Sequence, residues 1–183
     1  MKSIEAVIEQ DFSEKRRIHT YGVVETAKKL AKLYNVDVDK AVTASLYHDL
    51  FRGKPVNVIN YYVNHLGFDS KYLDNPNLAH GKIAAYIMKQ EYGIEDQEIL
   101  DAVSYHTTGR AGMSDLEKVV FLADAIEPNR KYPGVDQLRE LAVKDLNKAC
   151  LLSLERTIQF VTSKGEYLDP DTIDARDSLL KEI

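Results

Sequence analysis

The sequence predicts an all-α protein of 183 residues, a single helical bundle followed by C-terminal packing helices. Three observations favour this fold class. Glycine and proline are scarce, with nine and five residues, whereas alanine, leucine, glutamate and lysine are plentiful. Apolar residues recur at intervals of three and four, as on the buried face of a helix. Residues that cap helices precede several of these apolar stretches.

Two helices capped by serine are expected near the N-terminus. Ser3 precedes a short apolar stretch, and Ser13 precedes a longer one with a clear 3.6-residue period. His19 lies beside that second apolar stripe, near the helix start. From its position alone it is either a metal ligand or a histidine at the edge of solvent.

The next helix is expected to start at Asp37 or Asp39 and to end at the dipeptide 48–49. Gly53 and Pro55 break the helical pattern just beyond it. The core pattern explains the apolar residues of this helix but does not require a histidine followed by an aspartate.

His48 and Asp49 can contact one metal only at the end of the helix, because consecutive helical residues point about 100° apart. The alternative is a core histidine whose ring is held by Asp49 or by a backbone carbonyl. Arg52 and Lys54 follow closely. These two cations can lie near the metal, and they can also complement the dipole at the C-terminal end of the helix; the two interpretations are compatible.

The middle of the chain predicts two further helices. Residues 56–66 form the first, and His65 near its end is taken as structural or exposed. The second begins at residues 75–77, carries His80 in its first turn and ends at Gly93.

A helix capped by Asp96 is expected to close at His106. The loop that follows, residues 107–113, contains two threonines, two glycines and Arg110. Such a loop can offer backbone N–H groups, a hydroxyl and a guanidinium to a phosphate.

Residues 114–117 form a capping box that opens a buried helix with Asp124 near its end. A carboxylate inside an apolar run is costly unless it is paired or bound to a metal. Residues 127–131 stop this helix, and its end directs Arg130 back toward the same neighbourhood.

The C-terminal part is expected to serve packing. Residues 135–163 form one or two amphipathic helices, and residues 169–172 cap a last short helix that ends near Ile183. The chain is therefore one domain, residues 1–183, with a metal-binding core over about residues 16–131 and packing helices over about residues 135–183.

Composition narrows the function classes. A formal net charge of −5 provides no broad basic surface, so nucleic acid polymers are not expected partners and a phosphate must be held by local cations or a metal. The single Cys150 excludes an internal disulfide and a cysteine-based zinc finger. No apolar run reaches the length of a membrane span and none resembles a signal peptide, so a cytoplasmic protein without membrane contact is expected.

Four histidines and two aspartates form an ordered pattern over about a hundred residues. Most of them lie at helix ends, where several elements can build one pocket. Imidazole mixed with carboxylate suits iron, manganese, cobalt or zinc, and the donors alone do not choose among these metals. The six residues are His19, His48, Asp49, His80, His106 and Asp124.

This pattern resembles the HD-domain metal-dependent phosphohydrolases, and the chain is most similar to the YqeK family of symmetrical bis(5'-nucleosyl)-tetraphosphatases. In the family, the His-Asp pair is followed by an aromatic residue, a small residue and lysine, whereas in this chain it is followed by Leu50, Phe51 and Arg52. The positive charge at the third position is kept, but the guanidinium of arginine differs in shape from the ammonium of lysine. The closer resemblance is carried by residues 17–23, 47–49, 105–113, 116–119 and 123–130.

The resemblance implies a helical HD fold that holds iron, or else manganese, cobalt or zinc. A first metal would be bound by His19, His48, Asp49 and Asp124. Asp49 would bridge to a second metal on His80 and His106, or these two histidines would contact substrate phosphates, so that Asp49, His80 and His106 form the catalytic group. The implied substrate contacts are Arg52, Thr107, Thr108, Arg110 and Arg130.

The implied reaction is attack of a metal-activated water on diadenosine tetraphosphate, which releases two ADP molecules. Two other hypotheses stay open: an HD phosphohydrolase of another nucleotide, such as a deoxynucleotide or a guanosine polyphosphate alarmone, and a non-catalytic nucleotide-binding sensor. Nothing in the sequence identifies an adenine pocket. A homodimer is compatible with the sequence.

Overall fold

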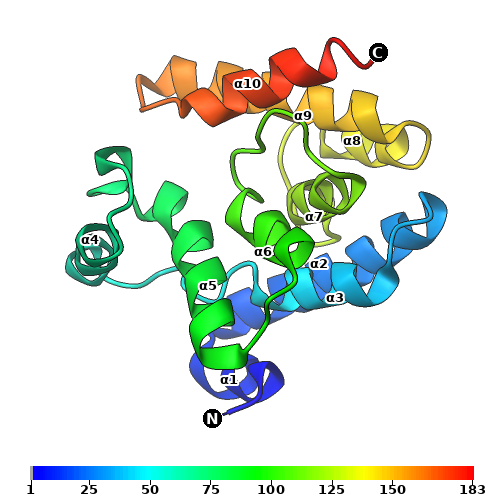
Figure 1. Ribbon diagram of the computed structural model, residues 1–183. Helices are drawn as coiled ribbons and strands as arrows, with labels where there is room; N and C mark the ends of the chain where they lie inside the picture. Colours follow the sequence, from blue (N-terminus) through cyan, green and yellow to red (C-terminus); the bar gives the residue numbers. More distant parts are fainter. Residues whose placement is uncertain (1) are drawn as a thin grey trace.

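The computed structural model describes residues 2–183, and over these residues it contains helices and no strand, which confirms the all-α prediction (Figure 1). Ten α-helices and one 3₁₀ turn follow one another in this part of the chain. They are α1 (Ile4–Asp11), α2 (Glu14–Leu33), α3 (Val38–Tyr47), α4 (Val56–His65), η1 (Ser70–Tyr72), α5 (Pro76–Tyr92), α6 (Gln97–Ser104), α7 (Asp115–Ile126), α8 (Val135–Ala142), α9 (Leu146–Lys164) and α10 (Pro170–Leu179).

The helices start at the capping residues that the sequence indicates. The hydroxyls of Ser3 and Ser13 accept hydrogen bonds from backbone N–H groups in the first turns of α1 and α2. Asp37, rather than Asp39, caps α3. Ser114 and Glu117 form the expected capping box, in which each side chain accepts from the backbone N–H of the other residue.

The C-terminal region agrees with the prediction, and the structure adds its boundaries. Two helices stand where one or two were expected, because Asp145 caps α9 after a break that follows α8. The last helix, α10, ends at Leu179, a few residues before Ile183. The short 3₁₀ turn η1 was not predicted; it forms where Asp69 accepts a hydrogen bond from the backbone N–H of Lys71.

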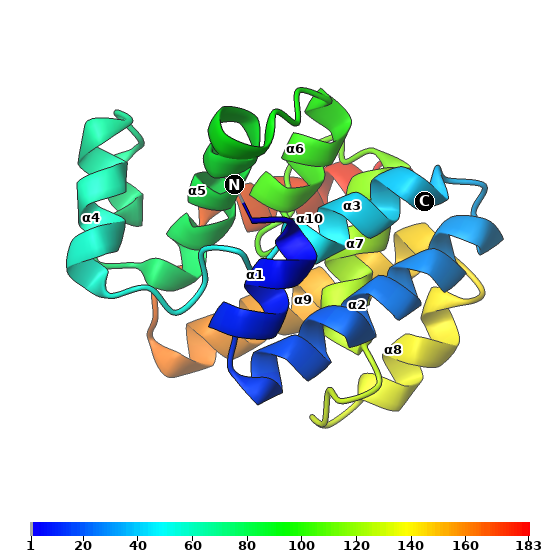
Figure 2. The ribbon, with the colours of Figure 1, turned by 90° about the horizontal axis from the view of Figure 1, so that it is seen from below.

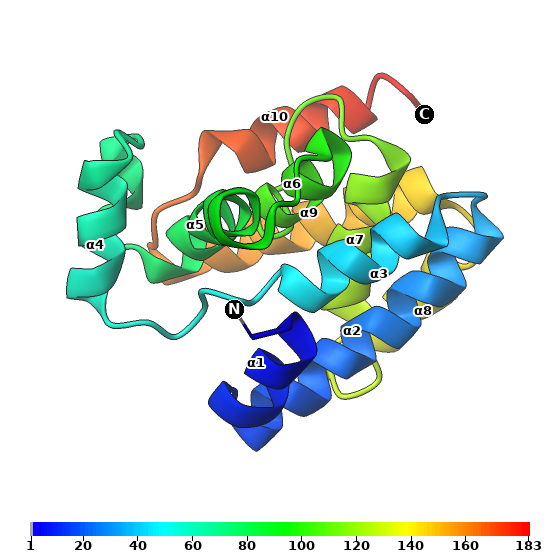
Figure 3. The same cartoon turned by 60° about the horizontal axis from the view of Figure 1, so that its bottom comes forward.

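Helix α7 lies at the centre of the bundle. It packs against α2, α3, α6, α8 and α9, and every residue from 116 to 123 is buried. In Figure 1, α9 and α10 lie above α7 and α1 lies below it, whereas α4 stands apart at the left, where it contacts α5 and η1. In the views from below and at 60°, α4 again stands apart at the left (Figures 2 and 3). This packing brings the ends of α3, α6 and α7 toward the early turns of α2 and α5.

Within residues 2–183, no helix combines the length and the apolar character that crossing a bilayer would require.

Candidate metal centre

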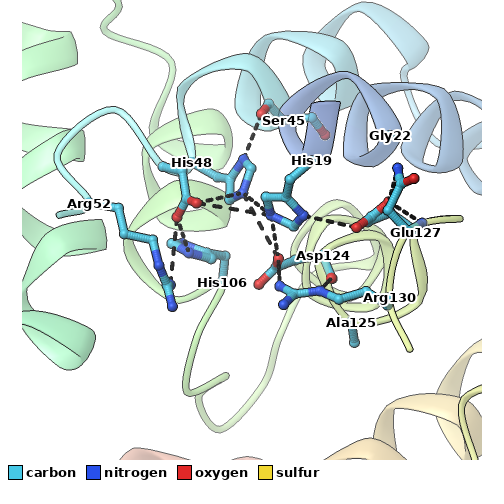
Figure 4. A network of polar contacts seen from close by, with 12 residues as sticks. His19, Gly22, Ser45, His48, Arg52, His106, Asp124, Ala125, Glu127 and Arg130 are labelled. Atoms are coloured by element: carbon cyan, nitrogen blue, oxygen red, sulfur yellow. Dashed lines mark hydrogen bonds and ion pairs between the residues drawn. The ribbon is translucent and has the colours of Figure 1, made fainter. Parts of the chain in front are cut away.

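The structure brings all six predicted metal-site residues together at the ends and faces of five helices. Figure 4 shows His19, His48, His106 and Asp124 of this set pointing toward one another. One residue comes from α2, one from α5 and one from the last turn of α7. The other three follow helix ends: two come directly after α3, and one comes just after α6. Their ligand atoms form two groups, in each of which all atoms lie within 4.8 Å of one another: His19, His48 and Asp124 in the first, and Asp49, His80 and His106 in the second.

The first group is built around the Nε2 atoms of two histidines. Nε2 of His19 lies 3.3 Å from Nε2 of His48 and 3.0 Å from Oδ1 of Asp124. Nε2 of His48 lies 3.9 Å from the same Asp124 oxygen. Three candidate ligand atoms therefore converge from α2, the end of α3 and α7.

Asp49 links the two groups, because each of its carboxylate oxygens faces one of them. Oδ2 lies 3.9 Å from Nε2 of His19 and 3.8 Å from Nε2 of His48. Oδ1 lies 3.3 Å from Nε2 of His80 and 4.0 Å from Nε2 of His106. A carboxylate in this position can bridge two cations.

Hydrogen bonds place a proton on Nδ1 of all four histidines. Each ring contacts an oxygen through Nδ1, and since carbonyl and carboxylate oxygens only accept, Nδ1 carries the proton. In His48, His80 and His106, Nε2 is then left with a lone pair that points into the cluster, as in histidines that bind metals. Nε2 of His19 faces Oδ1 of Asp124 and donates to it when no cation takes its place. The four pairs are His19 with Oε1 of Glu127 at 3.1 Å, and His48, His80 and His106 with the carbonyls of Ser45, Pro76 and Val103 at 2.7, 3.1 and 2.7 Å.

This arrangement fits a bound cation. Nε2 of His80 and Nε2 of His106 lie only 3.0 Å apart, and two lone pairs at that distance cannot form a hydrogen bond. Oδ1 of Asp49 is buried and receives no hydrogen bond, which is costly for a carboxylate. A divalent cation between these atoms would satisfy all of them, and the mixture of imidazole and carboxylate suits a transition metal.

Burial keeps two of the imidazoles neutral and ready to bind. It lowers the pKa of His48, and it lowers the pKa of His106 to about 3. His19 differs: burial lowers its pKa, but its contacts with Asp124 and Glu127 outweigh that effect and raise it.

The two aspartates are held in the charged form. Burial favours the neutral form of Asp124, but the hydrogen bond to His19 and the proximity of His48 keep its pKa well below the ordinary value. Asp49 behaves in the same way, since His48 and His80 lower its pKa in spite of burial. Both carboxylates therefore present negative charge to a cation.

Glu127 and Gly22 belong to the centre although neither was predicted. Glu127 is 2% exposed and holds Nδ1 of His19 through Oε1, while Oε2 accepts from the backbone and side-chain nitrogens of Asn129 at 2.7 and 3.0 Å. A Cβ on Gly22 would lie 2.5 Å from Oε2 of Glu127. A glycine inside a helix, one turn beyond His19, was the signal in the sequence, because such a glycine usually marks a close approach.

Two of the predicted arginines flank the cluster on opposite sides in Figure 4. Nη1 of Arg52 lies 3.7 Å from Oδ1 of Asp49, and Nη2 of Arg130 lies 2.5 Å from Oδ1 of Asp124. Both arginines line a cavity of about 310 Å³, which we call the metal-centre cavity. Its other lining residues are Ser13, Lys15, Arg16, His19 and Asp49.

The two predicted threonines lie beside the second group. Oγ1 of Thr107 is 3.2 Å from Nε2 of His106. Thr108 is buried, and its hydroxyl donates to the carbonyl of Gly109. Both threonines line a neighbouring cavity together with Arg52.

Arg110 lies outside the metal-centre cavity. Its guanidinium forms two hydrogen bonds with Glu117, at 2.6 and 3.1 Å, and one with Asp101, at 3.0 Å. These contacts give Arg110 a structural role that the sequence did not indicate, and they hold its guanidinium against carboxylates rather than among the lining residues of the metal-centre cavity. His65 is exposed and stacks on Tyr61, away from the cluster.

Comparison with known proteins agrees with this geometry. The HD domain family matches residues 16–129. A Bacillus subtilis (strain 168) protein named bis(5'-nucleosyl)-tetraphosphatase, symmetrical, is 42% identical over 91% of this chain and 90% of its own length. The protein of the same name from Halalkalibacterium halodurans is 41% identical over 96% and 95%. A crystal structure from Clostridium acetobutylicum, of a predicted HD superfamily hydrolase involved in NAD metabolism, matches the whole of both chains with a TM-score of 0.93 and 40% identity.

Proposed function

The chain belongs to the HD-domain family, and within it to the symmetrical bis(5'-nucleosyl)-tetraphosphatases, and on this basis we propose that it hydrolyses diadenosine tetraphosphate to two ADP molecules with the help of divalent metal. The observation that carries the proposal is the pair of ligand groups joined by Asp49. The substrate follows from relatives that carry this name, and two of them are covered over at least nine tenths of their length.

The first ligand group, with Oδ2 of Asp49, would hold one metal, and the second group, with Oδ1, would hold another. When bound, such metals lower the pKa of a water toward about 7 and stabilise charge on phosphoryl oxygens. We propose iron, with manganese, cobalt and zinc as metals that the same donors accept.

The cations around the metal-centre cavity orient the polyphosphate and neutralise its charge. Arg52 and Arg130 stand at opposite sides, and Lys15 and Arg16 line the same cavity. Charge-assisted contacts from these groups strengthen as negative charge develops on the leaving phosphate. ADP leaves as an anion because the second pKa of a phosphate is about 6, so no strong general acid is needed.

The alternatives considered from the sequence are not favoured. A hydrolase of deoxynucleotides or alarmones would share the ligand groups, but the relatives in question bear the name of the symmetrical tetraphosphatase. A sensor without catalysis is not favoured either, because the same relatives are named as phosphatases, which cleave the dinucleotide.

The proposal is tested on the purified protein by metal analysis and by chromatography of the products from diadenosine tetraphosphate. We expect bound divalent metal and ADP as the only nucleotide product. His48→Ala should lose both metal and hydrolysis, whereas His65→Ala, an exposed histidine outside the cluster, should keep both. Full activity in His48→Ala, or unequal nucleotide products from the parent protein, would overturn the proposal.

A further inference from the structure

We propose that two cavities beside the metal centre each hold one nucleoside of the substrate, and that Phe160 of α9 forms a wall common to both. The inference rests on the proposed function, because it assigns places to the two ends of a symmetrical dinucleotide. It concerns residues of the C-terminal helices, to which the sequence had given only a packing role.

The first cavity, which we call the Tyr132 cavity, has a volume of about 860 Å³ and lies between the α7–α8 connection and α9. The second, the Tyr167 cavity, has a volume of about 470 Å³ and lies between the start of α5, the loop after α6 and the α9–α10 connection. Both volumes lie in the range of roughly 300–1,000 Å³ that is usual for small-molecule sites.

The two arginines beside the metals connect these cavities to the centre. Arg130 lines both the Tyr132 cavity and the metal-centre cavity, and Arg52 lines both the Tyr167 cavity and the metal-centre cavity. A polyphosphate that passes from one cavity to the other through the centre would therefore meet a guanidinium on each side of the metals. This is the arrangement that a chain of phosphates with a nucleoside at each end requires.

Exposed aromatic rings line the outer parts of both cavities. Tyr132 is 37% exposed, Tyr167 is 52% exposed, and Phe160, which lines both cavities, is 59% exposed. An aromatic ring in such a place can stack on a nucleobase, which buries apolar surface on both partners and tolerates any base. Polar groups beside the rings, Gln159 in one cavity and Asn75 in the other, can donate to or accept from the base or the ribose.

The position of the cavities also accounts for symmetrical cleavage. A dinucleoside tetraphosphate held by both nucleosides has its central bridging oxygen near the middle of the path between them. Because Arg52 and Arg130 lie on opposite sides of the ligand groups, that middle falls at the metals. A substrate held by one nucleoside alone would lack this constraint.

The test compares the hydrolysis of diadenosine tetraphosphate by three metal-loaded variants, Tyr132→Ala, Tyr167→Ala and Phe160→Ala. Each should raise KM about tenfold or more, within the range of effects seen when one base–aromatic stack is lost, with a smaller change in kcat. Tyr61→Ala removes a ring of similar exposure on α4 that lines none of the three cavities. It is the matched control and should keep the parent KM. Tyr132→Phe keeps the ring and should also keep the parent KM.

The outcomes separate this inference from the proposed function. If the parent protein releases two ADP but Tyr132→Ala and Tyr167→Ala both keep its KM, the cavities do not hold the nucleosides, although the function stands. If only one of these variants raises KM, a single nucleoside is held and the two-cavity assignment is wrong. If the parent protein does not cleave the dinucleotide, the proposed function itself fails.

Discussion

Replacement of Glu127 by glutamine tests whether a residue that binds no metal itself prepares the centre for metal. The carboxylate uses both oxygens: Oε1 accepts from Nδ1 of His19, and Oε2 accepts from the two nitrogens of Asn129. Glutamine has the same shape but only one oxygen. It therefore cannot satisfy both sets of donors at once.

Either orientation of the new amide carries a defined cost. If its oxygen faces Asn129, its NH₂ group faces Nδ1–H of His19, so the imidazole must move its proton to Nε2 and loses the lone pair that would bind metal. If its oxygen faces His19, the two N–H donors of Asn129 lose their acceptor, at less than the roughly 1–3 kcal/mol of a fully buried group, because Asn129 is exposed and water can reach it. The first outcome lowers metal affinity, by about 10- to 100-fold for a partner of this kind, or about 1.4–2.7 kcal/mol. The second outcome lowers the free energy of unfolding.

The assay measures both quantities. Metal affinity of the apoprotein is obtained by competition with a chromophoric chelator, and the free energy of unfolding is obtained from denaturant titration of the metal-free protein. Glu117→Gln is the matched control, because Glu117 is also 2% exposed and also accepts several hydrogen bonds, but from Arg110 and Ser114 rather than from a ligand. It should lose stability and keep metal affinity. Unchanged metal affinity and unchanged stability in Glu127→Gln would refute the reasoning.

Three further predictions concern other residues. Gly22→Ala should weaken metal binding in the same competition assay, because the new Cβ would lie 2.5 Å from Oε2 of Glu127 and displace that carboxylate; parent-like affinity would contradict this. Arg110→Ala should lower the free energy of unfolding by about 1–3 kcal/mol, since it leaves the buried Glu117 without its cation. It should leave KM for diadenosine tetraphosphate unchanged. A raised KM would instead support the phosphate contact that the sequence predicted for Arg110. Burial lowers the pKa of Lys82 to about 8 from 10.5, so between these pH values the unfolded chain binds more protons than the folded chain. In denaturant titrations, the free energy of unfolding of the parent protein should therefore rise with pH across this window relative to that of Lys82→Met, by less than about 3 kcal/mol. Parallel pH profiles of the two proteins would exclude the shift.

The helix boundaries could be predicted because they depend on local chemistry. Ser13, Asp37 and Ser114 each accept a hydrogen bond from a backbone N–H two or three residues ahead, and such pairs are visible as short sequence patterns. The choice between Asp37 and Asp39 needed the structure, since both residues are acceptable caps. The break between α8 and α9 was left open because the apolar period continues through it.

The division of the centre into two groups could not be predicted from spacing. The order of histidines and aspartates along the chain does not specify the crossing of α2, α5 and α7, and that crossing decides which Nε2 atoms face which oxygen of Asp49. Arg110 shows the same limit. The loop that carries it follows His106 directly, which indicated a phosphate contact, but in the fold its guanidinium lies against Glu117.

The four histidines differ in how much tertiary structure their orientation needs. Nδ1 of His48 and of His106 donates to a carbonyl three residues earlier, in the last turn of α3 or α6, where carbonyls have no N–H partner within the helix. Nδ1 of His80 donates to a carbonyl four residues earlier. These three rings are thus oriented by their own helices.

His19 is the exception, because its Nδ1 turns away from α2 and donates to Glu127 at the end of α7. Its orientation therefore depends on how α2 packs against α7, and Gly22 allows the close approach that this packing needs. It follows that a substitution that removes the contact between Glu127 and His19 should change the orientation of His19 and weaken metal binding by the group of His19, His48 and Asp124. The histidine tautomers in the group of Asp49, His80 and His106 should stay unchanged.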